Sequence, residues 1–171
     1  MIKINFLPDS DLDDFSISSE EYEAIWKSDG EKILSALEKM TGYSFKETFI
    51  NAVVGGNKES RSHPLSLYAN LKFEVKKMTL THELGHRVLL LPRRQQYKNA
   101  SLWPTSLENH RVLFLVLYDA YEMIYGKDFA DSAVKRDSEQ LQGIYKEAWD
   151  FALSFKTKEE RQKKFREMIK S

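Results

Sequence analysis

Two histidines four residues apart, with a glutamate beside the first, are the residues of this chain best suited to chemistry. They are His82, Glu83 and His86, in the stretch LTHELGHRVL. Residues four apart on a helix lie on one face, one turn from each other. Both imidazole rings could therefore bind a single metal ion, and zinc suits neutral imidazole.

The glutamate between the two histidines has a distinct predicted role. A catalytic zinc site uses three protein ligands and leaves the fourth position to water. Glu83, next to the first histidine, could take the proton of that water as the water attacks a carbonyl that the metal polarises. We therefore predict His82 and His86 as metal ligands and Glu83 as the general base.

The residues around this motif predict a buried helix. Asn70 could cap its start, and Pro92 is expected to end it. The apolar positions that form one stripe along the helix are Phe73, Leu80, Leu84, Val88 and Leu91. A core helix with two structural histidines is the alternative. It is disfavoured because a buried acid beside a histidine pair needs its own explanation.

The motif resembles the active-site helix of zincin metallopeptidases. It differs from the metzincin branch, whose longer pattern requires glycine at 89 and histidine at 92, where this chain has Leu89 and Pro92. It is most similar to small gluzincin-like peptidases of the ImmA/IrrE type, in which a glutamate opening a later apolar helix completes the site. For this chain the resemblance, which covers about residues 65 to 125, implies Glu108 as the third zinc ligand.

Other residues compete for the place of third ligand. Glu108 also forms a capping box with Thr105, which explains a glutamate there without any metal. Asp119 and Glu122 lie on the same helix face as Glu108, and an acid on an apolar helix is costly unless it is paired or metal-bound. Asp119 and Glu122 therefore remain alternatives.

A group that stabilises the oxyanion of the intermediate is also expected. In the enzymes that the motif resembles, a histidine or tyrosine does this, and the candidates here are His110, Tyr118, Tyr121 and Tyr68. His110 lies about 200° around a regular helix from Glu108, so the two cannot face one ion together.

The resemblance also implies where a substrate would bind. In zincins the strand before the active-site helix often lies at the edge of the sheet, where it pairs with an extended peptide. Residues 64–68 alternate as a short strand, so we predict that Leu65, Leu67 and Tyr68 bind the substrate through the open backbone groups of an edge strand.

The remaining patterns predict an α+β fold in a single zincin-like domain, residues 1–171. Strands are expected at residues 2–7, 45–54 and 64–68, and helices at 18–40, 70–92, 105–125, 129–155 and 157–169. The first helix would begin at a capping box formed by Ser18 and Glu21. We expect a small sheet of about three strands, at least partly antiparallel, packed on the active-site helix and followed by further helices.

Composition excludes several classes of protein. The 171 residues contain no cysteine, so neither disulfides nor a thiolate zinc site can form. The formal net charge is zero, which favours no nucleic-acid partner. No run of about 18 apolar residues predicts a membrane span, and the first residues lack the apolar core of a signal peptide. We therefore expect a cytoplasmic protein.

These patterns lead to a predicted function. The chain is expected to be a zinc-dependent metallopeptidase that hydrolyses a peptide bond in a peptide or protein substrate, with Glu83 activating the water. The alternative is a catalytically silent zinc-binding regulatory or interaction protein of the same fold.

Overall fold

The computed structural model describes residues 2–96, 105–141 and 143–170. The chain divides into two compact units. The first comprises Met1–Ser35 and Ser44–Arg87, and the second comprises Ala36–Tyr43 and Val88–Ser171. Two long helices, α1 (Asp13–Thr41) and α2 (Phe73–Gln96), each pass from the first unit into the second.

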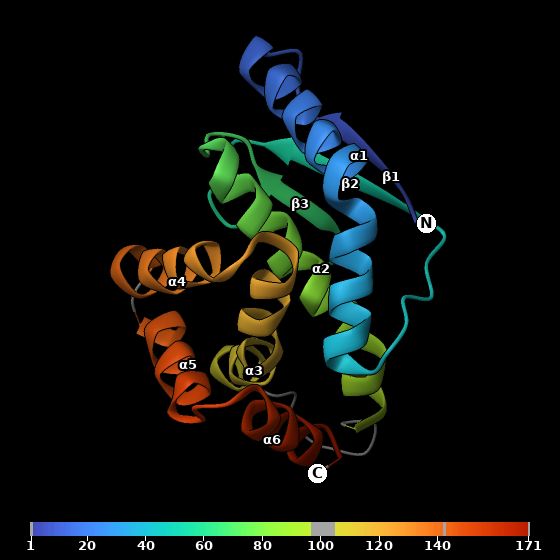
Figure 1. The fold of residues 1–171 in the computed structure, drawn as a ribbon. Coiled ribbons are helices and arrows are strands. Elements are labelled where there is room, and N and C mark those ends of the chain that lie inside the picture. Colours follow the sequence, from blue (N-terminus) through green and yellow to red (C-terminus); the bar gives the residue numbers. More distant parts are fainter. Residues whose placement is uncertain (1, 97–104, 142, 171) are drawn as a thin grey trace. The chain divides into compact units, whose positions relative to one another are not determined.

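The sheet of the first unit has three strands in the order β1-β2-β3 (Figure 1). They are β1 (Lys3–Pro8), β2 (Phe49–Gly55) and β3 (Leu65–Tyr68), and both pairs are parallel. The fold is α+β as expected, but the prediction of a partly antiparallel sheet was wrong. The 29 residues of α1 carry the chain back across the sheet, so that β2 starts at the same end as β1.

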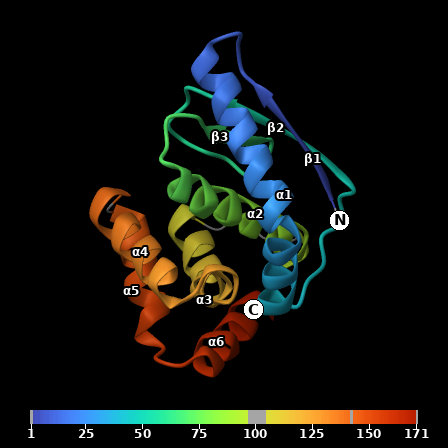
Figure 2. The same ribbon diagram turned by 45° about the horizontal axis from the view of Figure 1, so that its top comes forward.

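One face of the sheet forms the core of the first unit. Its buried side chains alternate along the strands with exposed ones, as expected of a sheet covered on one side. The buried set is Ile4, Ile50, Ala52, Val54, Leu65 and Leu67. Helix α1 runs along the sheet (Figure 2). Its Tyr22 is fully buried, stacks on Phe6 and donates a hydrogen bond to the carbonyl of Tyr68 at 3.0 Å.

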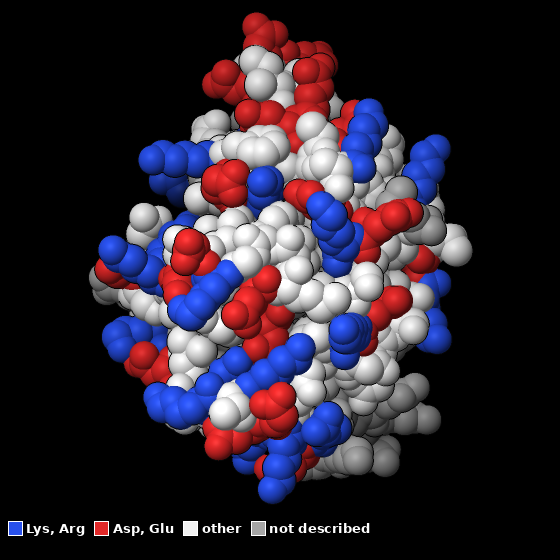
Figure 3. Space-filling view, viewed as in Figure 1, with Lys and Arg blue, Asp and Glu red and all other residues white. Residues whose placement is uncertain are grey.

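Helix α1 begins five residues before the predicted capping box. Asp13 and Asp14 occupy its first turn, where acids stabilise the helix dipole, and acidic side chains gather where α1 begins (Figure 3). Ser18 lies inside the helix and donates to the carbonyl of Ala69 at 2.6 Å. The buried amine of Lys76 donates to both Ser18 and Glu21. The predicted cap residues instead join α1 to α2.

Helix α2 carries the histidine motif. Leu80, Leu84 and Val88 are buried, as the predicted stripe requires, whereas Phe73 at the start of the helix is exposed. Pro92 does not end the helix, which continues to Gln96. A proline removes its own N–H and crowds the preceding turn, yet a helix can continue beyond it with a local distortion.

The second unit contains the remaining helices. They are α3 (Ser106–Tyr125), α4 (Lys127–Arg136), a π-helical turn η1 (Asp137–Leu141), α5 (Gly143–Ser154) and α6 (Lys158–Lys170). The capping boxes predicted at Thr105 and Thr157 are confirmed. The single helix predicted for residues 129–155 was wrong, because Gly143 adopts a positive φ of 50° where the chain leaves the π-helical turn.

Helix α3 is the centre of the second unit. Val112 through Leu117 are all buried, and Phe114 stacks on Trp149 of α5 with ring centroids 4.0 Å apart. Asp119 pairs with Arg161 of α6. Among the described residues, none of the helices is both long enough and apolar enough to cross a membrane.

Candidate metal and catalytic site

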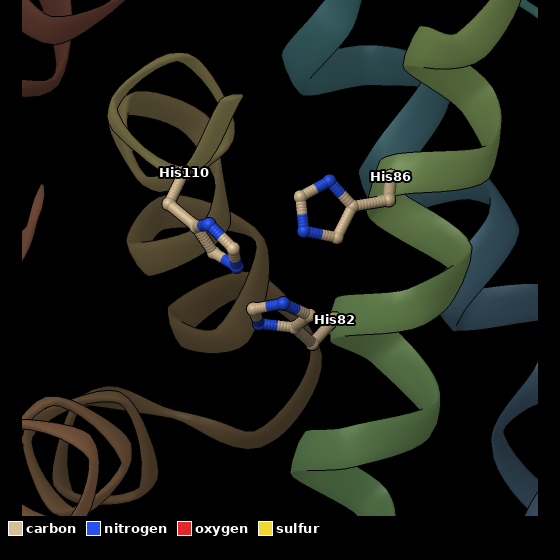
Figure 4. Close-up of side chains that lie close together, drawn as sticks. All are labelled: His82, His86 and His110. Carbon is tan, nitrogen blue, oxygen red and sulfur yellow. The ribbon is translucent and has the colours of Figure 1, made fainter. Parts of the chain in front are cut away.

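Helix α2 brings the predicted histidine pair together on one face. The ring centroids of His82 and His86 lie 4.8 Å apart, with an angle of 66° between the rings. His82 is only 7% exposed, and His86 is half-buried. The helix thus holds two imidazoles side by side, as the spacing predicted (Figure 4).

Glu83 lies in the same buried stretch of α2. It is 6% exposed, and burial raises the pKa of its carboxyl group from 4.5 to about 8. Within the part of the chain that the structure describes, loss of hydration on burial is the cause of this shift. A carboxyl group whose pKa lies near neutral pH is well matched to general acid–base catalysis.

A third histidine, His110 of α3, belongs to the same group of possible metal ligands. Each of the three rings offers one nitrogen, and these nitrogens all lie within 4.8 Å of one another. Among the residues that the structure describes, this is the group of histidine, aspartate and glutamate side chains that could hold a metal ion.

The surroundings of His110 fix its ring. Its Nδ1 lies 2.7 Å from the carbonyl oxygen of Ser106, one turn earlier in α3. The carbonyl can only accept, so Nδ1 carries the proton and the lone pair of the neutral ring lies on Nε2. Phe114 and Tyr145 pack against the ring, with centroids 5.5 and 4.6 Å from it. Burial lowers the pKa of His110, although the bond to Ser106 opposes this.

This donor set fits zinc. Neutral imidazole is a preferred zinc ligand, and three protein ligands are typical of a catalytic site. A backbone carbonyl that orients the second ring nitrogen, as Ser106 does for His110, is the usual support for a histidine ligand.

The three acids predicted as third ligands lie elsewhere. Glu108 is exposed, and its carboxylate accepts a hydrogen bond from the Thr105 backbone N–H at 2.9 Å. Asp119 is bonded by Arg161, and Glu122 is exposed. None of them belongs to the group formed by the three histidines. A histidine in this position departs from the gluzincin-like pattern that the motif resembles.

The residues predicted to bind substrate are mostly buried. Leu65 and Leu67 are each 1% exposed, so their side chains belong to the core, and Tyr68 is half-buried. The outward backbone groups of β3 bond to Ser60 and Arg61. A role of this strand in binding substrate stays a prediction, and it would depend on the backbone.

Sequence reasoning assigned His110 at most a role in stabilising the oxyanion. A signal for its present position does exist in the sequence. Residues 110, 114, 117 and 121 recur with the spacing of one helix face, and apart from His110 they are the large apolar residues Phe114, Leu117 and Tyr121. All four are buried. A histidine on such a face needs a partner, and a metal is one.

Comparison with known proteins adds no relative. No protein-family model, no curated protein and no solved structure matches this chain. The resemblance to zincin metallopeptidases therefore rests on the motif alone.

Proposed function

We propose that this protein is a zinc-dependent peptidase in which His82, His86 and His110 hold the metal and Glu83 is the general base. The observation that carries the proposal is that α2 holds the rings of His82 and His86 side by side, with centroids 4.8 Å apart, and buries the residue that follows His82, Glu83. The substrate is proposed to be a peptide or protein in the cytoplasm.

The chain's own residues would act as follows. Bound zinc would supply Lewis-acid chemistry, which activates water and a carbonyl group. The Glu83 carboxylate would accept a proton from the attacking water and then, as a carboxylic acid, donate it to the nitrogen of the departing amine.

Replacing Glu83 with glutamine tests the proposal. Glutamine keeps the size of the side chain but cannot accept the proton, so hydrolysis of unstructured peptides should fall by about 10²- to 10⁴-fold. Zinc content, measured by elemental analysis, should stay unchanged. Glu74→Gln, at an exposed position in the first turn of the same helix, is the matched control and should retain activity. Hydrolysis by Glu83→Gln at the wild-type rate would contradict the mechanism.

A second candidate function has one observation in its favour. If the protein were a zinc-binding regulatory protein without turnover, the edge of β3 would not need to be accessible. That edge is bonded to Ser60 and Arg61 of the same chain. A specific protein partner that binds the zinc-loaded wild type and is never cleaved would favour this second function.

A further inference from the structure

The outer edge of β3 is paired with another segment of the chain. The backbone N–H of Arg61 donates to the carbonyl of Ser66 at 2.8 Å, and the N–H of Ser66 donates to the carbonyl of Arg61 at 2.9 Å. The N–H of Tyr68 donates to the Ser60 hydroxyl at 3.1 Å. These are the backbone groups with which an added extended peptide would pair.

The segment that makes these bonds is the connection between β2 and β3. Because the two strands are parallel, residues 56–64 must return the chain to the starting end of the sheet. The antiparallel bridge between Arg61 and Ser66 places this return path along the outer side of β3. We call residues 57–62 the strap. Since the topology requires a connection here, the strap can be loosened but not removed.

The strap is also bound to the helix that carries the histidine pair. Arg87, which directly follows His86, donates from Nη1 to the carbonyl of Ser62. Its Nε lies 2.9 Å from Glu47 Oε1, an ion-pair contact without the alignment of a hydrogen bond. The Arg87 side chain is 8% exposed. A buried guanidinium thus anchors one end of the strap to α2.

We propose that the strap is an autoinhibitory element, which occupies the edge of β3 until its release lets an extended peptide pair there. The proposal rests on the proposed function only in taking this edge as the place where substrate binds. The strap holds Ser66 and the Tyr68 N–H by three hydrogen bonds, each of modest net strength, so these groups can be released without unfolding of the sheet. The Tyr68 carbonyl accepts from Tyr22 of α1 and is independent of the strap.

Substitutions at Arg61 test the proposal. Arg61→Pro removes the N–H that bonds to Ser66, whereas Arg61→Ala keeps the backbone pairing and removes only an exposed side chain. Both are made in the Glu83→Gln background, so that bound peptide is not cut. The probe is a fluorescein-labelled mixture of unstructured decapeptides, and the readout is fluorescence anisotropy.

The expected result is a gain of binding in one variant only. The proline variant should bind the peptide mixture at least about tenfold more tightly than the background protein, and the alanine variant should stay within about twofold. Hydrogen exchange at the Ser66 and Tyr68 amides should accelerate only in the proline variant. Ser60→Ala, which loses only the bond to Tyr68, should give a gain of about threefold and serves if the proline variant does not fold.

Binding by Arg61→Pro and Ser60→Ala no tighter than that of Arg61→Ala would overturn the proposal. Its failure can be told apart from failure of the proposed function. Peptide binding is measured without turnover, so a wild-type enzyme that binds zinc and hydrolyses nothing would count against the peptidase and leave the result on the strap unaffected.

Discussion

Glu83 and Asp119 are both carboxylic acids buried on helices, but their surroundings are opposite. Asp119 is 3% exposed, and both of its oxygens accept hydrogen bonds from Arg161, at 2.6 and 3.1 Å. Arg161 also donates to the carbonyl of Phe155 at 3.0 Å. Glu83 is 6% exposed, and in the described part of the chain burial is the cause that raises its pKa. The fold thus compensates the buried charge of Asp119, whereas burial disfavours the charged form of Glu83.

This is the difference that we expect between a structural acid and the general base that we propose. The pair of Asp119 and Arg161 joins α3 to α6, and a buried ion pair of this kind is explained by packing. Among the described residues Glu83 has no ion pair of this kind, and buried acids with a strongly raised pKa are frequent at catalytic sites. We therefore expect the two acids to respond in opposite ways to neutral substitution.

The largest effect on stability is expected at Asp119. Asp119→Asn removes the charge that balances the buried Arg161, so the free energy of unfolding should fall by about 3–5 kcal/mol. Urea unfolding followed by circular dichroism measures it. Asp150→Asn, which disturbs only an exposed pair with Lys146, is the control and should change stability by about 0.5 kcal/mol or less. If Asp119→Asn lowered the free energy of unfolding no more than the control does, the contrast between Asp119 and Glu83 would not hold.

Glu83→Gln should behave differently in the same assay. In metal-free protein at pH 8, an amide avoids the cost of ionising a buried carboxyl group, so the free energy of unfolding should stay equal or rise, by about 1 kcal/mol. If the proposed function is right, this variant should lose activity while it keeps its stability. If this variant instead lost as much stability as Asp119→Asn, Glu83 would be a structural anchor.

The smallest effect is expected at Asp137, which is intermediate between the two. Its oxygens accept from Trp149 Nε1 at 3.1 Å and Arg136 Nη1 at 2.8 Å, yet burial outweighs these bonds and raises its pKa above 3.8. Above pH 3.8 the folded state therefore holds a proton that the unfolded state has lost, and stability falls as pH rises toward the raised pKa.

Asp137→Asn should abolish this part of the pH dependence. Asparagine can still accept from Trp149, so the change in the free energy of unfolding at any one pH should stay within about 1 kcal/mol. Urea unfolding at a series of pH values from 4 upward, compared with wild type, measures the effect. If the free energy of unfolding varied with pH in the same way in both proteins, Asp137 would not take up a proton on folding.

Local patterns in the sequence were sufficient to predict several features. The spacing of His82 and His86 placed both rings on one face of α2, and the capping boxes at Thr105 and Thr157 marked the starts of two helices. Each of these features depends on residues within one or two turns, where helix geometry determines the outcome.

Features that depend on distant residues were not predictable in this way. The direction of the strands follows from the path of α1 and of the connection between β2 and β3. A connection of nine residues without a helix is typical of a hairpin, which predicts antiparallel strands. The grouping of His110 with the α2 pair is likewise non-local. That Glu108 and His110 cannot serve one ion together stays a prediction: His110 belongs to the group with His82 and His86, and the Glu108 carboxylate accepts from the Thr105 N–H.

Zinc content tests the central claim most directly. Wild type, His110→Ala and Glu108→Ala would be purified without added metal, incubated with zinc, dialysed and measured by elemental analysis. The account predicts one zinc per chain in wild type and in Glu108→Ala, and its loss in His110→Ala. Retention of zinc by His110→Ala together with loss in Glu108→Ala would contradict the ligand set, and a wild type that takes up no zinc would contradict the metal site altogether.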